Sequence, residues 1–247
     1  ILNIIRNNKP IKIDSNLIPH ASIYAKEDFC LVSGITTKNN KSLGQDLGEI
    51  VKVGNKGVPI VASFKDIPET DVVIDFSEPN FSLKAIDYSL ENHLPIVIGT
   101  TGFEKKQLNF INKASETIPI LLAPNTSIGI ALIKKLFNFP PKALLYFDEI
   151  KIREKHHKDK LDSPSGTALD LSDYLSKKTK RKKIAIESER EGVNAGEHKI
   201  ILAKGKELVE VSHKVLDRSV FVEGALLGAN WIFSQPKGLY NMSDIYS

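Results

Sequence analysis

The stretch Val72-Val73-Ile74-Asp75-Phe76-Ser77 sets the fold of the first half of the chain. Its apolar run is rich in β-branched residues and ends at a polar turn, which is typical of a buried strand. Apolar residues then recur at helical spacing, and a second apolar run follows at Pro95 to Ile98. A strand, a helix and a strand in this order predict a βαβ unit with parallel strands.

Similar β-rich runs lie on both sides of this unit, at Pro10 to Ile13, Phe29 to Ile35, Val58 to Ala62 and Ile118 to Ala123. They predict an α/β, Rossmann-like nucleotide domain. Polar turns follow three of the strands, at Asp75 to Ser77, Gly99 to Gly102 and Ala123 to Thr126. An open α/β sheet binds its ligand at that edge, so we expect these turns to line a ligand site. Asp75, Asn125 and Ser127 could instead cap helices.

The pattern changes after Ser127. Long β-like runs cover Ala143 to Glu154, Lys183 to Glu191, His198 to Leu202 and Glu207 to Val215, and Ser219 to Trp231 is again helical. Consecutive strands with few helices predict an α+β domain built on an open mixed sheet. We therefore expect a nucleotide domain of residues 1–126 plus 217–247, and a substrate-binding and oligomerisation domain of residues 127–216.

Composition excludes several classes of protein. The formal net charge is +4, but the basic run 177–183 has no interleaved aromatic residues, so we expect a solvated segment and no nucleic-acid partner. No stretch approaches the roughly 20 apolar residues of a membrane span, and the first residues do not resemble a signal peptide. A single cysteine, Cys30, excludes an internal disulfide and suits the cytoplasm.

The chemistry concentrates in residues 156–168, His-His-Lys-Asp-Lys-Leu-Asp-Ser-Pro-Ser-Gly-Thr-Ala. Adjacent histidines on an extended strand point to opposite faces, so His156 and His157 would divide the roles of acid and binding group. Lys160 adds charge and a possible proton donor. Gly166 and Thr167 would begin a helix whose amides attract an anion. This combination predicts a site that protonates and binds a dicarboxylate; the alternative is a solvated polar loop.

Residues Glu154 to Ala168 resemble the signature Glu-x-His-His-x-x-Lys-x-Asp-x-Pro-Ser-Gly-Thr-Ala of the dihydrodipicolinate reductase family. The resemblance extends through Gly99 to Phe103, Ala123 to Gly129 and Gly238 to Met242. It implies a homotetrameric oxidoreductase of lysine and diaminopimelate biosynthesis. Such an enzyme reduces 4-hydroxy-tetrahydrodipicolinate, a cyclic dicarboxylate, to tetrahydrodipicolinate with NADPH or NADH.

The resemblance also implies roles for single residues. His156 and Lys160 would be catalytic, and His157, Lys160, Gly166 and Thr167 would bind the substrate. The cofactor would be bound by a third set, namely Gly99, Thr100, Thr101, Ala123, Pro124, Asn125 and Thr126. We expect no metal, and we expect His198 and His213 to be structural histidines of a sheet.

The chain departs from the family pattern near its beginning. Its first glycine is Gly34, and Asp14-Ser15-Asn16 stands where the family has a Gly-rich turn that holds a pyrophosphate. No acidic residue follows the strand that ends near Gly34, and Thr36, Thr37 and Lys38 favour NADPH over NADH. Two alternatives to the reductase remain: a cofactor-impaired homologue that acts as a binding or regulatory protein, and a reductase of another small acid.

Overall fold

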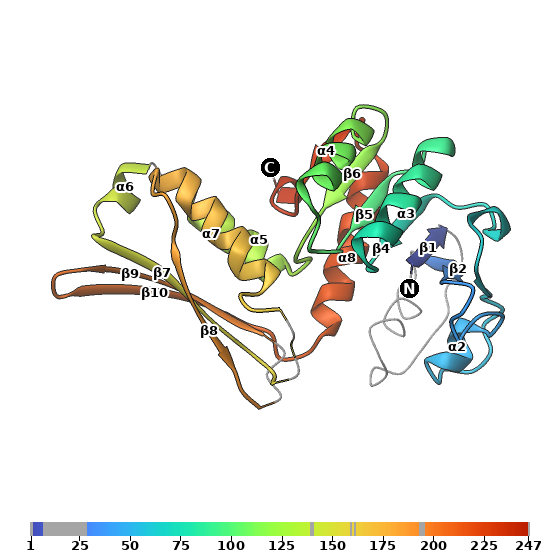
Figure 1. The fold of residues 1–247 in the computed structure, drawn as a ribbon, viewed down its shortest axis with the longest axis horizontal. Helices are drawn as coiled ribbons and strands as arrows, with labels where there is room; N and C mark the ends of the chain where they lie inside the picture. Colours follow the sequence, from blue (N-terminus) through green and yellow to red (C-terminus); the bar gives the residue numbers. More distant parts are fainter. Residues whose placement is uncertain are drawn as a thin grey trace. The chain divides into compact units, whose positions relative to one another are not determined.

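A computed structural model of the chain describes residues 2–6, 29–138, 141–158, 160, 162–192 and 196–246. Internal contacts divide the chain into two compact units. Unit 1 comprises Ile1–Thr126 and Phe221–Ser247, and unit 2 comprises Ser127–Val220. Figure 1 shows the helices and strands of each unit.

Unit 1 is built on a seven-stranded sheet with the order β11-β6-β5-β4-β1-β2-β3. Its strands are β1 (Leu2–Arg6), β2 (Cys30–Ile35), β3 (Ile60–Val61), β4 (Val72–Asp75), β5 (Ile96–Ile98), β6 (Pro119–Leu122) and β11 (Gly238–Tyr240). The pairs β2–β3, β4–β5, β5–β6 and β6–β11 are parallel. The expected α/β architecture is therefore confirmed, and β2 to β6 lie in the runs that predicted them.

Strand β1 was not among the expected strands, and it pairs antiparallel with both of its neighbours, β2 and β4, in a sheet that was expected to be parallel. Leu2 lies opposite Asp75 and Ile5 lies opposite Val72. Arg6 therefore ends β1 at the edge where β4 begins, whereas the polar turns follow the other ends of β4 to β6. The strand expected at Pro10 to Ile13 lies outside the described residues.

Two helices of unit 1, α3 (Pro79–Glu91) and α4 (Lys105–Ala114), pack on the parallel strands. Proline occupies the first turn of α3, and Glu104 and Gln107 form a capping box at α4. Ala85, Ile86 and Ile111 pack with Ile96 and Ile98 in one buried cluster. The remaining elements of the unit are α2 (Leu47–Ile50), η2 (Phe64–Asp66), α8 (Ser219–Phe233), which begins in unit 2, and η3 (Asp244–Tyr246).

Unit 2 carries a four-stranded mixed sheet with the order β10-β9-β7-β8. The strands are β7 (Glu149–His156), β8 (Ala185–Arg190), β9 (Glu197–Lys204) and β10 (Glu207–Lys214). β7 and β8 are parallel, and the other two pairs are antiparallel. The crossover from β7 to β8 contains α7 (Gly166–Thr179), as a parallel connection requires.

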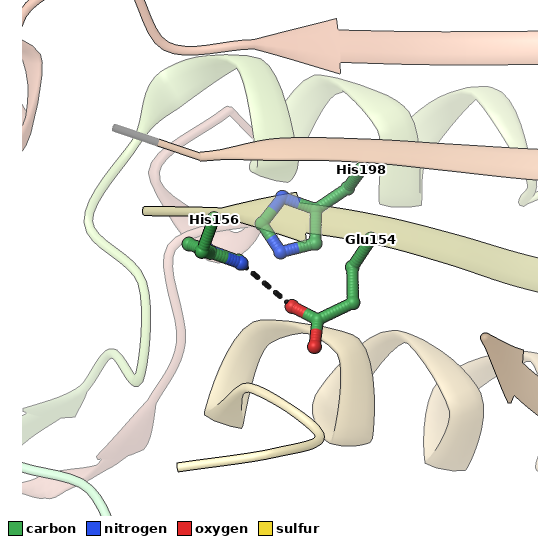
Figure 2. Close-up of side chains that lie close together, drawn as sticks. All are labelled: Glu154, His156 and His198. Carbon is green, nitrogen blue, oxygen red and sulfur yellow. Dashed lines mark ion pairs between the residues drawn. The ribbon is translucent and has the colours of Figure 1, made fainter. Parts of the chain in front are cut away.

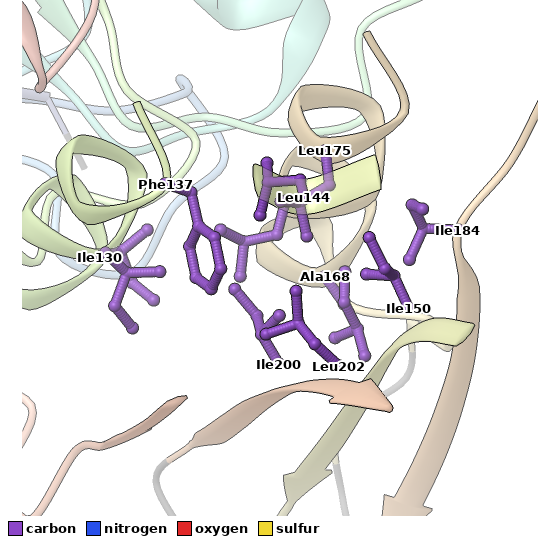
Figure 3. Close-up of a cluster of buried hydrophobic side chains, with 12 residues drawn as sticks. Ile130, Phe137, Leu144, Ile150, Ala168, Leu175, Ile184, Ile200 and Leu202 are labelled. Carbon is purple, nitrogen blue, oxygen red and sulfur yellow. The ribbon is translucent and has the colours of Figure 1, made fainter. Parts of the chain in front are cut away.

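The core of unit 2 lies between this sheet and α7, together with α5 (Ile128–Leu136). Ile150 and Ile152 of β7 meet Ala168, Leu171 and Leu175 of α7 in one cluster (Figure 3). β7 alternates buried and accessible positions, and Glu154 and His156 continue the buried series. The alternation that builds the core therefore also points two ionisable side chains inward.

The expectation of a strand from Ala143 was wrong for its first residues, because Pro141–Leu145 form a helix, α6. Ala143, Leu144 and Leu145 all have high helix propensity, and Leu144 joins the core of the unit. The strand begins only at Glu149. Across the described ranges, no helix is both long and apolar enough to cross a membrane.

Candidate active site

Glu154, His156 and His198 form a buried polar cluster in unit 2 (Figure 2). Glu154 and His156 come from β7, and His198 comes from the adjacent strand β9. Nδ1 of His156 lies 2.7 Å from Oε2 of Glu154. The His156 and His198 rings meet edge to face, with their centroids 5.1 Å apart.

Glu154 has no solvent exposure, and its carboxylate joins several elements of the unit. Oε1 accepts hydrogen bonds from the backbone N–H of Ser165, at 3.1 Å, and from Nη2 of Arg190, at 2.8 Å. Burial alone raises the pKa of Glu154, but its contacts with His156, Ser165 and Arg190 outweigh burial and hold that pKa well below its usual range. The carboxylate is therefore ionised at neutral pH.

His198 was expected to be a structural histidine of a sheet, and it does lie in strand β9. Because β9 pairs with β7 and aligns His198 with Glu154, the structure also brings it against the cluster. Burial is the main reason that the pKa of His198 falls to about 3, and repulsion from His156 adds to it. Its Nε2 lies 3.3 Å from Oγ of Ser165. A neutral His198 thus places no second positive charge beside His156.

The same cluster could be considered for a metal ion, since ligand atoms of its three residues lie within 4.8 Å of one another. Arg190 already places a cation on Glu154. A metal ion would have to bind against this charge and separate Glu154 from His156. The arrangement therefore suits proton transfer better than metal binding.

The first turn of α7 lies close to the cluster. Ser165 is its N-cap, and Oγ of Ser165 accepts from the backbone N–H of Ala168 at 3.2 Å. Gly166 and Thr167 follow as the first two helical residues, as expected, and Thr167 is buried. The positive end of a 14-residue helix therefore lies where the sequence predicted an anion site.

Lys160 and Asp162 form an ion pair in the loop before α7, with Nζ 2.6 Å from Oδ1. Burial alone raises the pKa of Asp162, but Lys160 and a hydrogen bond from the backbone of Gly166 lower it overall. Asp162 therefore contacts two of the groups that the sequence assigned to the substrate. The ion pair shows that Lys160 can bind a carboxylate in front of the helix start.

His157 follows β7 and faces Arg218, whose Nη2 lies 3.0 Å from its Nε2. A guanidinium can only donate, so Nε2 of His157 accepts and the proton of this neutral imidazole is on Nδ1. His157 and Arg218 thus form a pair with donors for a carboxylate. The sequence pattern missed Arg218 as a partner because 61 residues separate the two positions.

Gly196 lies against the other ring nitrogen of His156. A Cβ built on Gly196 would come within 3.1 Å of Nε2 of His156, and the φ of Gly196 is +154°. Both facts favour glycine, because a side chain would be strained and would crowd the ring. The space beside Nε2 is thus preserved by the absence of a side chain.

In unit 1, Asp75 ties together the turns that follow β4 and β5. Its buried carboxylate accepts hydrogen bonds from Ser77, from Ser82 of α3 and, at 3.0 Å, from Thr100. Thr100 in turn accepts from the backbone N–H of Ser77. Asp75 therefore does not cap α3, whose N-cap is Glu78, but it has a structural role because it holds the turns in shape.

The turn at 99–102 combines a buried and an exposed part. Thr100 is buried, whereas Thr101 and Gly102 are exposed. Phe76 packs on Gly99, where a Cβ would overlap its ring at 2.2 Å, yet 39 % of Phe76 remains exposed. An exposed aromatic face beside accessible backbone fits a planar, amide-bearing ring such as nicotinamide.

The turn after β6 carries the other expected cofactor residues, Ala123, Pro124, Asn125 and Thr126. Ala123 and Thr126 are buried, and the Thr126 hydroxyl donates to the carbonyl of Phe221 at 2.6 Å. Pro124 and Asn125 are half-buried. Ser127, in unit 2, occupies the N-cap position of α5, but its hydroxyl contacts Nε2 of His213 at 3.0 Å.

Two further segments were expected near the cofactor: the polar turn in place of the Gly-rich turn, and the residues after β2. Asp14, Ser15 and Asn16 lie outside the described residues. Thr36, Thr37 and Lys38 directly follow β2, and Lys38 is exposed in a turn.

Two family models match the chain over most of its length. Residues 18–126 match the N-terminus of dihydrodipicolinate reductase, and residues 129–246 match its C-terminus. The 4-hydroxy-tetrahydrodipicolinate reductase of Buchnera aphidicola subsp. Cinara cedri is 42% identical over 200 residues, which cover 73% of each chain. That of Methylococcus capsulatus is 32% identical over 235 residues, which cover 87% of each chain.

Solved structures agree with this assignment. The dipicolinate-bound dihydrodipicolinate reductase from Paenisporosarcina sp. TG-14 superimposes with a TM-score of 0.69 at 25% identity, covering 91% of this chain and 92% of that one. An amine dehydrogenase from Mycobacterium smegmatis shares the fold alone, with a TM-score of 0.62 at 10% identity over 90% and 89% of the two chains. This chain belongs to the dihydrodipicolinate reductase family.

Proposed function

We propose that this chain reduces 4-hydroxy-tetrahydrodipicolinate to tetrahydrodipicolinate with NAD(P)H, in lysine and diaminopimelate biosynthesis. The observation that carries the proposal is the buried pair of His156 and Glu154, in the same unit as the N-terminal turn of α7. A hydride, a proton and the loss of water balance this conversion. The relatives named for the reaction support the choice of substrate.

The two carboxylates of the substrate suit two cationic places in unit 2. One is Lys160 with the amides of Gly166 and Thr167, and the ion pair of Lys160 with the carboxylate of Asp162 supports this assignment. The other is His157 with Arg218. Charged donors strengthen such contacts, and a bound dicarboxylate would be held at both ends.

His156 supplies the proton in this proposal. Its Nδ1 is engaged by Glu154, while Nε2 lies beside the space that Gly196 leaves open. The Nε2–H bond breaks, its electron pair stays on the ring, and the proton goes to the substrate. Lys160 assists by binding and by offering an ammonium proton.

The cofactor supplies the hydride when it is bound. Gly99, Thr100, Thr101 and the turn from Ala123 to Thr126 would hold its nicotinamide end, and the exposed ring of Phe76 supports this assignment. Thr36, Thr37 and Lys38 would accept a 2′-phosphate, so we propose NADPH as the preferred cofactor.

We also propose a homotetramer, assembled through the sheet of unit 2. Edge strand β10 exposes Leu208 and Val209, with 60% and 37% of their surfaces accessible, and exposed strand edges favour pairing with another chain. Light scattering at micromolar concentration should give the mass of a tetramer, and a monomer would refute this part. We place the enzyme in the cytoplasm, where its free Cys30 would stay reduced.

A second candidate, a homologue that binds the dicarboxylate but is impaired in cofactor binding, is favoured by antiparallel β1 and by the lack of glycine before Gly34. A coupled test separates the two. Calorimetry measures the binding of dipicolinate and of NADPH, and absorbance follows NADPH oxidation with 4-hydroxy-tetrahydrodipicolinate. Reduction that falls on the order of 10² to 10⁴-fold in His156→Ala supports the reductase. Dipicolinate binding with neither NADPH binding nor reduction supports the second candidate.

A further inference from the structure

Glu154 is a buried charge that the proposed reaction does not use directly. Its contacts come from three places in unit 2: His156 on its own strand, Arg190 on β8 and the backbone N–H of Ser165 at the start of α7. Arg190 also donates to the carbonyl of Asp162, at 2.6 Å. Glu154 therefore connects the proposed proton donor with the segment that would hold a substrate carboxylate.

The carboxylate of Glu154 decides which nitrogen of His156 carries the proton in the neutral ring. Nδ1 of His156 lies within ion-pair distance of Oε2, at 2.7 Å, and an ionised carboxylate has no proton to donate, so this contact favours the form of the ring with a proton on Nδ1. When His156 is protonated, its second proton is then on Nε2, beside Gly196. Losing that proton returns the ring to the neutral form that Glu154 already stabilises.

We propose that Glu154 is the positioning residue for proton transfer, acting through His156. This inference rests on the proposed reductase function. Glu154 holds the imidazole by Nδ1, so that Nε2 gives its proton to the substrate and later regains one from water. Glu154 itself keeps its charge throughout, as does the carboxylate that orients the histidine of a serine protease triad.

The surroundings of the ring fit this role. The His156 ring lies beside the carboxylate of Glu154, meets neutral His198 edge to face and has Gly196 next to Nε2, while Arg190 contacts the other oxygen of Glu154. Arg190 and Ser165 bind Oε1, whereas His156 lies beside Oε2, and Ser188 of β8 also helps to lower the pKa of Glu154. The two oxygens thus have different partners. A substitution can therefore remove the negative charge beside His156 and still keep the hydrogen bonds to Ser165 and Arg190.

Glu154→Gln makes that separation. The amide keeps the shape of the side chain, and its oxygen can still accept from Ser165 and Arg190. Its NH₂ group would donate to Nδ1 of His156, so the neutral ring would carry its proton on Nε2 and the protonated ring would lose its partner. We expect kcat to fall at least about tenfold and at most to the level of His156→Ala, while KM changes less than about twofold.

Asp170→Asn is the matched control. It also turns an acid into its amide, breaks the ion pair of Asp170 with Lys134 on α5, and lies on α7 of the same unit. Its kcat should stay within about twofold of the unaltered chain. A double-mutant cycle adds the decisive comparison: if Glu154 acts through His156, Glu154→Gln should have almost no further effect on kcat in the His156→Ala chain.

Nitrogen-15 spectra of the imidazoles test the same idea without turnover. In the full chain, His156 should carry its proton on Nδ1 in the neutral form, and Glu154→Gln should move it to Nε2; His156→Ala identifies the signals. An inactive parent chain with the expected proton position would refute the reductase but not the positioning role. Our inference would be overturned if Glu154→Gln left the spectra or kcat unchanged, or if it affected mainly KM. It would also be overturned if Glu154→Gln lowered kcat in the His156→Ala chain as much as in the unaltered chain.

Discussion

Asp162 should compete with the substrate, because its carboxylate pairs with Lys160, which we propose as a ligand of a substrate carboxylate. Its carboxylate contacts Nζ of Lys160 at 2.6 Å, and the backbone of Gly166 helps to lower its pKa. A substrate carboxylate that binds there must displace it. We therefore expect Asp162→Asn to tighten binding of the dicarboxylate, whereas most changes of a residue in a binding site weaken it.

The size of the effect follows from the exposure of the pair. The side chains of Lys160 and Asp162 are 24% and 51% exposed, so water screens their attraction. Pairs of this kind contribute about 0.2 to 1 kcal/mol. Removing the competitor should therefore lower the Kd for dipicolinate by a factor of about 1.4 to 5.

Isothermal titration calorimetry with dipicolinate measures this change directly. Asp173→Asn is the control, since it removes the same charge from an exposed i,i+4 pair with Lys177 on α7. It should leave the Kd almost unchanged. Weaker binding of dipicolinate in Asp162→Asn would contradict the account, because Asp162 would then support the site and not compete for it. Equal tightening in both variants would also contradict it, because the effect would then come from the net charge of the chain.

Four further predictions follow. Thr167→Val deletes a hydroxyl near the helix start, so KM for the substrate should rise while the Kd for NADPH stays constant; the reverse would assign Thr167 to the cofactor. Gly196→Ala should lower kcat strongly, because φ of +154° and the contact with His156 both oppose a side chain, and a kcat like that of the parent would show that the loop adapts. The pKa of His198 is lowered from 6.5 to about 3, so the unfolded chain binds the proton first as pH falls. The contribution of His198 to the free energy of unfolding should then fall by about 0.7 kcal/mol per pH unit at pH 6.5, where half of the unfolded chains carry the proton, and by about 1.4 kcal/mol per pH unit near pH 4.5. His198→Gln should reduce this slope in urea titrations. Calorimetry should show weaker NADPH binding than in a relative with a Gly-rich first turn, and a Gly-rich turn built between Ile13 and Pro19 should strengthen NADPH binding. Tight binding by the unaltered chain would show that the other turns are enough to bind NADPH.

Local patterns were enough to predict most of the fold. β-branched runs such as Val72 to Asp75 become strands wherever both faces are buried, and the change of pattern after Ser127 reflects a new sheet. Two features were not predictable in this way. The direction of β1 depends on its pairing with strands that are distant in the sequence. Helix α6 lies in a short apolar run, and such a run is typical of a strand as well as of a helix.

The candidate site also has a part that the sequence could predict and a part that it could not. His156, His157, Lys160, Gly166 and Thr167 stand in one contiguous motif, so the sequence could group them. Arg190, His198 and Arg218 reach the site only through strand pairing and the entry to α8. Asp162 belongs to the motif, but the motif alone does not show that Asp162 forms an ion pair with Lys160.

Transfer of a labelled hydride tests the central claim most directly. The unaltered chain is mixed with 4-hydroxy-tetrahydrodipicolinate and NADPH that carries deuterium at the transferable position, and the product is analysed by mass spectrometry. Our account predicts tetrahydrodipicolinate with one deuterium, and far slower formation of it in His156→Ala. Dipicolinate binding without any deuterated product would contradict the account and would make this chain a binding protein.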